Sequence, residues 1–341
     1  NPYLATSSLN QPKIIIYDIY ERKKEMRDYL DFVFPLKEIQ LAINETSNKK
    51  DNLDKNVLKT ISKLQSEYNK LEKKIFKLLT PIQILQLARH PNRPHSITFI
   101  DHIFTDFQSV HGNRTGADCP TTITGIGYLD DYPIMVIAQE KGFELEDRIR
   151  NNFGMMSPSG YQKAQRAMKL AEKFQIPIIT LIDTPGAYPG IKAEEDNQSG
   201  AIAENLKLMA ELKTPIINCI IGEGCSGGAL GIGMGDYTYM LQYASFSVIS
   251  PEGCASILWK TAEKKDLAAK EMKLCATDLI KLNLIDEIIE EGLGGAHQNP
   301  IDTFKNLKKK LLKTVAASLK IKKENLLKNR FDKLMLNHLH E

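Results

Sequence analysis

The stretch Ile216–Asp236 constrains the fold of this 341-residue chain more than any other part of the sequence. Its opening run, Ile216–Ile221, is mostly apolar and β-branched, which predicts a short strand buried on both faces. Several glycines then interrupt the apolar pattern, and Ala229–Met234 is typical of the first turns of a helix with small side chains. A strand that passes through a glycine turn into a helix indicates an α/β fold.

The same turn predicts a site for a negatively charged oxygen. Gly227 and Gly228 stand at the expected start of the helix, where backbone N–H groups have no partner within the helix and the helix dipole is positive. Such donors suit an oxyanion or an enolate. Glycine is expected here because a Cβ atom would block the close approach of a substrate.

Two other interpretations of this turn stay open. Gly224–Gly228 fits the G-x-S-x-G pattern of the serine-hydrolase nucleophile elbow, with Ser226 as the nucleophile. A triad would then need Asp286 and His297, which follow in the right chain order. The third interpretation is a tight turn that serves only the packing of helix on strand.

Composition excludes several classes of protein. The net charge of +3 is small and the charges alternate along the chain, which argues against a nucleic-acid surface. No apolar run approaches the ~20 residues of a membrane span, and no secretory signal is visible. The cysteines form no C-x-x-C pair and have no histidine at ligand spacing, so neither a disulfide framework nor a metal site is expected. They are Cys119, Cys219, Cys225, Cys254 and Cys275.

The sequence predicts four parts. Residues 1–18 form a loose N-terminal tail, 19–80 a helical hairpin, 81–300 the main α/β domain and 301–341 a C-terminal helical tail. The hairpin is indicated by a heptad of apolar side chains, which needs a surface to pack on. The heptad consists of Val57, Ile61, Leu64, Tyr68, Leu71, Ile75 and Leu78.

Strands and helices alternate through the main domain. A connector is expected from Pro81. The predicted strands are Thr122–Leu129, Pro133–Gln139, Pro177–Ile182, Ile216–Ile221, Tyr237–Leu241, Phe246–Ile249 and Leu284–Ile289. The predicted helices are Ile97–Phe107, Ser159–Phe174, Gln198–Leu212, Glu252–Trp259 and a basic amphipathic helix from Lys305.

Two consecutive strands end in strongly turn-forming segments, Asp183–Gly190 and Gly222–Gly228. Sites in parallel α/β sheets form where loops leave the carboxyl ends of strands, so these segments are expected to share one cleft. Neither matches a phosphate-binding or dinucleotide-binding motif. Backbone amides without an obvious side-chain base suggest stabilisation of a developing oxyanion while the substrate or cofactor moves its own protons.

At these residues the chain resembles the alpha subunit of the carboxyltransferase of multi-subunit acetyl-coenzyme A carboxylase. The matching blocks follow the family's order and spacing. They are Leu87–His95 (LARHPNRPH), Phe104–Gly112 (FTDFQSVHG), Asn152–Met155 (NFGM), Asp183–Gly190 (DTPGAYPG), Gly222–Gly233, Ser250–Lys260 (SPEGCASILWK) and Leu293–His297 (LGGAH).

The resemblance implies a crotonase-like fold of repeated ββα units, with the N-terminal helical hairpin and C-terminal helices added to it. It implies transfer of a carboxyl group from carboxybiotin, held on the biotin carboxyl carrier protein, to acetyl-coenzyme A, which gives malonyl-coenzyme A for fatty-acid synthesis. The implied partners are a zinc-ribbon beta subunit, in a heterotetramer of two alpha and two beta chains, the carrier protein and biotin carboxylase. The implied compartment is the bacterial cytoplasm or the plastid stroma.

The resemblance also assigns site residues. The N–H groups of Gly227 and Gly228 match the family's oxyanion hole, which would hold the ureido oxygen of biotin, and the ureido nitrogen would serve as the base. The substrate cleft would include the neighbouring glycine-rich positions and Ser226, with no metal on this chain. Those positions are Gly186, Ala187, Tyr188, Gly190 and Gly224.

Several positions depart from the family pattern. Gln139-Glu140 stands where His-Gln is usual, Asp196-Asn197 where Arg-Gly is usual, and Cys225 where glycine is usual. Basic residues are expected at three further positions, which are Phe143, Glu146 and Asn151 here. These losses concern contacts to coenzyme A phosphates or to the carrier protein. Two alternatives remain: a hydratase-like or thioesterase-like enzyme of the same fold that acts without biotin, and a non-catalytic scaffold subunit.

Overall fold

The computed structural model describes residues 30–47 and 55–336. The chain divides into two compact units, Asn1–Lys77 and Leu78–Glu341. The expected tail at residues 1–18 lies outside the described residues. The four-part division expected from the sequence stays a prediction.

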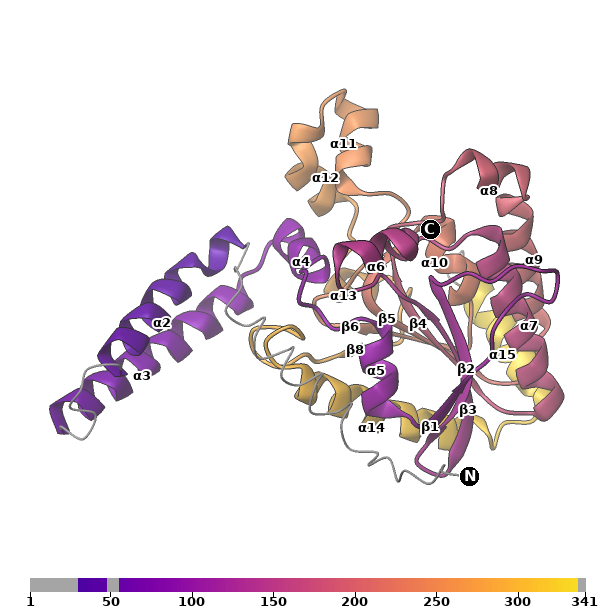
Figure 1. The fold of residues 1–341 in the computed structure, drawn as a ribbon, viewed down its shortest axis with the longest axis horizontal. Helices are drawn as coiled ribbons and strands as arrows, with labels where there is room; N and C mark the ends of the chain where they lie inside the picture. The colour runs from indigo at the N-terminus through magenta and orange to yellow at the C-terminus, as the bar shows by residue number, and fades with distance from the viewer. Residues whose placement is uncertain (1–29, 48–54, 337–341) are drawn as a thin grey trace, which may run out of the picture. The chain divides into compact units, whose positions relative to one another are not determined.

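The first unit contains a helical hairpin, as the heptad predicts. A short 3₁₀ turn, η1 (Asp31–Val33), precedes α2 (Phe34–Ser47), and α2 packs against α3 (Lys55–Lys77) (Figure 1). The heptad side chains from position 57 to position 75 are half-buried. Leu78 lies beyond the end of α3 and is 69% exposed. The heptad is therefore one residue shorter than expected.

We expect Leu64→Asp to loosen this hairpin, because the new carboxylate would replace a half-buried apolar side chain. Amide hydrogen exchange of α2 and α3 should accelerate about tenfold or more, which corresponds to a loss of roughly 1–3 kcal/mol of local stability. Ser62→Asp adds the same charge at an exposed position of the same helix and should leave the exchange unchanged. Equal amide protection of α2 and α3 in the two variants would show that the heptad side chains are not packed.

The second unit holds all eight strands of the described sheet. The strands are β1 (Thr105–Ser109), β2 (Thr122–Leu129), β3 (Tyr132–Gln139), β4 (Ile178–Thr184), β5 (Ile216–Cys225), β6 (Tyr237–Leu241), β7 (Ser245–Ser247) and β8 (Glu287–Ile289). The helices are α4 (Pro81–Ala88), α5 (Ser96–Ile103), α6 (Leu145–Arg150), η2 (Asn152–Gly154), α7 (Pro158–Phe174), α8 (Ile191–Glu195), α9 (Gln198–Glu211), α10 (Ser226–Gly233), α11 (Pro251–Trp259), η3 (Ala262–Lys264), α12 (Lys265–Glu271), α13 (Ala276–Leu279), α14 (Pro300–Ser318) and α15 (Lys323–Leu336).

The sheet order is β1-β2-β3-β4-β5-β6-β8, with β7 paired to β5. The pairings of β1 with β2 and of β2 with β3 are antiparallel, and the other pairings between these strands are parallel. Figure 1 shows α7, α9 and α15 on one side of the sheet and α5 and α14 on the other. Strands that are covered on both faces are apolar throughout rather than alternating.

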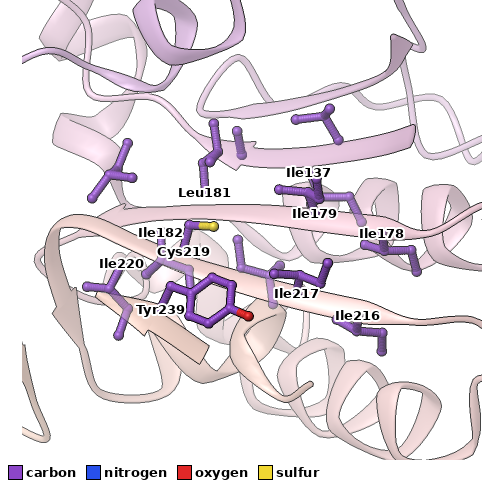
Figure 2. Close-up of a cluster of buried hydrophobic side chains, with 14 of the residues drawn as sticks. Ile137, Ile178, Ile179, Leu181, Ile182, Ile216, Ile217, Cys219, Ile220 and Tyr239 are labelled. Carbon is purple, nitrogen blue, oxygen red and sulfur yellow. The ribbon is translucent and has the colours of Figure 1, made fainter. Parts of the chain in front are cut away.

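The core lies along the central parallel strands. All seven residues of β4 are buried, and the isoleucines of β4 and β5 pack between the two helical layers. Figure 2 shows this cluster, in which Ile178, Ile216 and Ile217 lie near one end of the strands and Ile182 and Ile220 near the other. The helix α14 also contributes Phe304, Leu307, Leu311 and Val315 to the same core.

The longest departure from the expected elements is in β5. The strand does not end at Ile221 but continues through both glycines to Cys225, and α10 begins at Ser226 rather than at Ala229. Pairing explains the extension, because Glu223, Gly224 and Cys225 are paired with β7. Sheet pairing therefore overrides the low strand propensity of glycine at this position.

Two smaller expectations are wrong. The helix expected at Ile97–Phe107 ends at Ile103, and Thr105–Ser109 forms the edge strand β1, whose side chains are mostly exposed and so give no apolar pattern. The connector expected from Pro81 is the helix α4. Its N-terminus has a capping box, since Thr80 accepts the Gln83 N–H while the Gln83 side chain accepts the Thr80 N–H.

Candidate active site

The strand-to-helix junction at β5 and α10 contains no loop. Cys225 ends the strand and Ser226 begins the helix with a φ of +53°, in the left-handed region. This conformation turns the chain sharply at one residue. The N–H groups of the first turn, including those of Gly227 and Gly228, precede the first i→i−4 bond of α10 and have no partner within the helix.

A second turn from β4 lies against this junction. Thr184 ends β4, and its hydroxyl accepts the Gly186 N–H at 3.1 Å and donates to the Gly186 carbonyl at 2.7 Å. Gly186 has a φ of +150° and open space where a Cβ would stand. The segment after Thr184 is thereby held in a fixed turn beside α10, so the two predicted loops do come together.

Gly228 shows how closely the two turns approach. A Cβ at this position would lie 2.5 Å from the Ala187 nitrogen and inside van der Waals contact of the Gly186 backbone. Such a Cβ would strike the neighbouring turn rather than a substrate, which corrects the reason expected for a glycine at this position. At Gly227 a Cβ would meet only the Ile202 side chain, at 3.6 Å.

Gln139, at the end of β3, connects both turns. Its Nε2 donates to the Gly228 carbonyl at 2.7 Å, and its Oε1 accepts the Asp183 N–H at 3.2 Å. The Tyr161 hydroxyl also donates to the Gly228 carbonyl, at 3.3 Å. Both side chains are fully buried. Because the Gly228 carbonyl is held by two donors, the orientation of the first turn of α10 is fixed. Sequence reasoning missed this role, and the only signal was a polar residue at the end of an apolar strand.

A charged cluster fills the space beside the two turns. Lys141 lies 2.6 Å from the Asp183 carboxylate and 3.1 Å from that of Glu223, and Arg89 lies 2.7 Å from Glu223. Burial by itself would raise the pKa of Glu223, but Lys141 and Arg89 lower it below its ordinary value. Burial lowers the pKa of Lys141, but Asp183 and Glu223 raise it above its ordinary value. The ion pairs therefore favour the charged forms of both Glu223 and Lys141.

Packing explains why positions 222 and 224 are glycines. A Cβ on Gly222 would stand 2.6 Å from the Asp183 carboxyl carbon, so this glycine makes room for the carboxylate. Gly224 is buried inside β5, and its Cβ would stand 2.9 Å from the Phe246 ring. The geometry thus places Gly224 in the packing of the sheet rather than in a cleft.

The other expected cleft residues follow β4. Ala187 and Tyr188 are half-buried, and the Tyr188 N–H donates to the Met156 carbonyl at 3.1 Å. The Tyr188 ring covers Gly190, where a Cβ would stand 2.5 Å from it. Ser226 is exposed at the start of α10. Gly186 and Ala187 form the turn that Gly228 meets, Tyr188 and Gly190 follow it along the chain, and Ser226 lies two residues before Gly228.

The hydrolase triad does not form among the described residues. No hydrogen bond joins Ser226 to His297 or Asp286 there. Asp286 instead accepts the Thr238 N–H at 2.6 Å and contacts Lys333. The His297 ring is stacked on His90, with ring centroids 4.0 Å apart. The nucleophile-elbow interpretation lacks its base.

The positions that depart from the family pattern have their own local roles. The Phe143 ring stacks on His95, with centroids 4.8 Å apart. Asn151 is buried and its carbonyl accepts the Thr121 hydroxyl at 2.8 Å. Asp196 pairs with Lys192 at 2.8 Å on an exposed surface. Glu146 lies in the first turn of α6.

In the described part of the chain, no group of three or more His, Cys, Asp or Glu side chains is placed to hold a metal ion. Within the same residues, no helix is both long and apolar enough to cross a membrane.

Comparisons with known proteins agree with this architecture. The family described as acetyl co-enzyme A carboxylase carboxyltransferase-like matches residues 29–337. The acetyl-coenzyme A carboxylase carboxyl transferase subunit alpha of Azotobacter vinelandii is 49% identical over 308 residues, which cover 90% of this chain and 98% of the relative. The corresponding protein of Coxiella burnetii is 55% identical over 284 residues, covering 83% of this chain and 90% of the relative.

Solved structures share the fold at low sequence identity. Transcarboxylase 12S, solved with methylmalonyl-coenzyme A and methylmalonic acid, has a TM-score of 0.54 at 18% identity and covers 66% of this chain and 42% of its own. A Pseudomonas malonate decarboxylase hetero-tetramer in complex with coenzyme A has a TM-score of 0.53 at 15% identity, covering 64% and 88%. The fold is accordingly the crotonase-like α/β fold of carboxyltransferases. With a family match over nearly all of its length and relatives that are about half identical, this chain belongs to the acetyl-coenzyme A carboxylase carboxyltransferase family, as an alpha subunit.

Proposed function

We propose that the first turn of α10 stabilises a negatively charged oxygen while a carboxyl group passes from carboxybiotin to acetyl-coenzyme A. One observation carries the proposal: Gly228 packs directly on the backbone of Gly186 and Ala187. This contact fixes the N–H groups of Gly227 and Gly228 at the edge of the sheet where β4 and β5 end. That edge is where parallel α/β sheets bind ligands.

The donors at this turn fit a ureido oxygen. Carboxybiotin, when bound, supplies the carboxyl group to be transferred and, in its ureido nitrogen, a base. This chain's backbone N–H groups would hold the ureido oxygen and stabilise the charge that develops on it, and preorganised donors of this kind need no rearrangement during the reaction. Gln139 and Tyr161 would keep the turn in position through the Gly228 carbonyl. Gly186, Ala187, Tyr188, Gly190 and Ser226 would border the ligand.

The proposed partners follow from the relatives, whose names describe a subunit alpha. The other half of the site would come from a zinc-ribbon beta subunit in a heterotetramer, with biotin delivered by a carrier protein that biotin carboxylase charges. The product, malonyl-coenzyme A, would serve fatty-acid synthesis in the bacterial cytoplasm. The low-identity malonate decarboxylase, itself a hetero-tetramer, supports a multi-subunit arrangement for this fold.

The decisive experiment is co-purification of the chain with its beta subunit, followed by a malonyl-coenzyme A assay with carboxylated carrier protein. We expect a stable complex whose product formation requires both the carrier and the beta chain. Hydration or hydrolysis of acyl-coenzyme A by this chain alone would favour the hydratase or thioesterase alternative. A complex that forms and transfers no carboxyl group would favour the scaffold.

We expect Ser226→Ala to lower carboxyl-transfer turnover by less than about tenfold. The exposed hydroxyl has no hydrogen bond to His297 or Asp286 in the described structure, and only the backbone of this turn is proposed to act. Loss of a triad nucleophile costs roughly a millionfold in turnover. Steady-state kinetics of the assembled variant separates the two cases, and a loss of several orders of magnitude would contradict the backbone mechanism.

A further inference from the structure

The segment after β3 carries a lysine whose ammonium group lies between two buried carboxylates. Lys141 Nζ is 2.6 Å from the Asp183 carboxylate and 3.1 Å from the Glu223 carboxylate. The Lys141 side chain is 16% exposed, and the side chains of its two partners are 4% and 10% exposed. In the described part of the chain, Lys141 is the only cation that forms an ion pair with Asp183. Removal of this lysine would therefore leave a buried carboxylate without a counter-ion.

Each of the two carboxylates belongs to a strand end that leads into one of the two turns of the site. Asp183 directly precedes Thr184, whose hydroxyl holds the turn at Gly186. Glu223 lies in β5, shortly before α10 begins at Ser226. The Asp183 carboxylate also accepts the Glu223 N–H at 2.9 Å. The separation of the two turns therefore depends on how these carboxylates are held.

The position of Lys141 is itself fixed by its neighbours. The Glu140 carboxylate accepts the N–H groups of Ile97 at 2.9 Å and of Gly142 at 2.8 Å, which fixes the backbone on which the lysine stands. Gly154 makes room for the lysine stem, because a Cβ there would stand 2.7 Å from the Lys141 Cγ. The ammonium group is therefore held between its partners by packing as well as by charge.

We propose that Lys141 is a positioning residue for the oxyanion-binding turn, because it holds the ends of β4 and β5 together through their two carboxylates. The inference rests on the proposed role of the Gly227 and Gly228 amides. At Gly228 a Cβ would stand 2.7 Å from the Gly186 Cα, so a shift of either strand end displaces one turn against the other. Without the ammonium group, the carboxylates would repel each other across the gap that Lys141 fills.

The other charged and titratable side chains of the cavity beside this pair do not replace Lys141. They are Arg89, Arg93, Arg148, His90 and His95. In the described structure, Arg89 alone among them forms an ion pair with either carboxylate. It pairs with Glu223 at 2.7 Å and is shared with Glu252 at 3.1 Å. After loss of Lys141, Asp183 and Glu223 would have one cation between them, and that cation is already shared.

Lys141→Met is expected to lower the kcat of the assembled enzyme at least about tenfold at pH 8, since small displacements of a catalytic group are costly. The KM for acetyl-coenzyme A should stay within about threefold of the wild type. The defect should be smaller at pH 6. Two buried carboxylates without their cation have one raised pKa, and a protonated carboxyl group no longer repels its neighbour. A defect that is equal at both pH values, or confined to KM, would contradict the positioning role.

The double variant Lys141→Met/Asp183→Asn distinguishes positioning from direct action on the substrate. It removes the repulsion, leaves Glu223 paired with Arg89, and keeps a side-chain oxygen that can accept the Glu223 N–H. We expect it to regain most of the turnover that Lys141→Met loses and to lose the added pH dependence. A double variant as slow as Lys141→Met would mean that the ammonium group itself acts on the substrate, and would overturn the proposal.

Lys163→Met is the matched control. Lys163 is also a buried lysine, 4% exposed, and it pairs at 2.7 Å with Asp118. The Asp118 side chain is 43% exposed, so water can solvate it when the lysine is lost. This variant should keep wild-type turnover within a few-fold and the wild-type pH dependence. A pH-dependent defect as large as that of Lys141→Met would show that loss of any buried lysine has this effect, and would contradict the specific role.

Amide hydrogen exchange of the full chain without its partners tests the same inference independently of the reaction. The N–H groups of Gly186, Tyr188 and Glu223 are hydrogen-bonded in the structure. Lys141→Met should accelerate their exchange at least about tenfold relative to the wild type at pH 8, and Lys163→Met should not. Unchanged exchange would overturn the positioning role. Accelerated exchange in a protein that transfers no carboxyl group would instead support the contact and contradict the proposed function.

Discussion

Gly228→Ala is expected to lower carboxyl-transfer turnover of the assembled enzyme by at least about 10²-fold. The added Cβ would stand 2.5 Å from the Ala187 nitrogen, and neither that backbone nor the α10 backbone can yield without moving a turn. A misplacement of about 1 Å in a catalytic constellation costs on the order of 10²-fold in rate. Loss of one oxyanion donor costs roughly 10²–10³-fold.

A control variant and separate measurements of folding and kinetics distinguish a catalytic defect of Gly228→Ala from misfolding. Gly233→Ala, at the other end of α10, adds a Cβ that meets only the terminal methyl group of Ile182, at 3.1 Å, and no backbone atom, so its turnover should stay within a few-fold of the wild type. Complex formation and circular dichroism of Gly228→Ala should resemble those of the wild type, with the defect in kcat rather than in the KM for acetyl-coenzyme A. Near-normal turnover in a folded, assembled Gly228→Ala complex would remove these amides from the mechanism.

The sequence predicts the central sheet well because the strands are covered on both faces. Thr122–Leu129 is confirmed as β2, and Tyr237–Leu241 as β6. The apolar run from Ile178 to Ile182 also lies in its expected strand, because burial on both faces requires apolar side chains at every position. Such runs are visible in the sequence without knowledge of their neighbours.

The details of the site could not be predicted, because each depends on a distant residue. Gly222 is needed to make room for Asp183, and Gly224 to make room for Phe246, so both stay in the strand. Gln139 acts through partners 44 and 89 positions away. The local sequence pattern predicts the turn and its glycines. It does not predict the long-range contacts that orient the backbone amides.

The Arg93–Glu291 ion pair could not be predicted from the sequence for the same reason. Its two residues are 198 positions apart, and each is almost fully buried. Arg93 donates both terminal nitrogens to the Glu291 carboxylate and its Nε to the Ile221 carbonyl at 2.8 Å. Glu291 also accepts the N–H groups of Tyr243 and Ala296. This one pair therefore joins the segment before α5, the middle of β5 and the segment after β8.

We expect Arg93→Met to lower the free energy of unfolding of the second unit by about 3–5 kcal/mol, since it leaves a buried carboxylate without its cation. Urea unfolding followed by the fluorescence of Trp259, the chain's single tryptophan, reports on this unit. The exposed pair of Arg150 and Asp147 is the control, and Arg150→Met should cost less than about 1 kcal/mol.

The double variant Arg93→Met/Glu291→Leu separates the unpaired charge from the lost packing. Replacing both partners by apolar side chains removes the desolvated carboxylate, so we expect the double variant to regain part of the stability that Arg93→Met loses. A double variant less stable than Arg93→Met would mean that the hydrogen bonds from Glu291 to Tyr243 and Ala296 matter more than the charge. An Arg93→Met variant as stable as the wild type would show that the carboxylate finds water or another cation, and the pair would then not hold these three segments together.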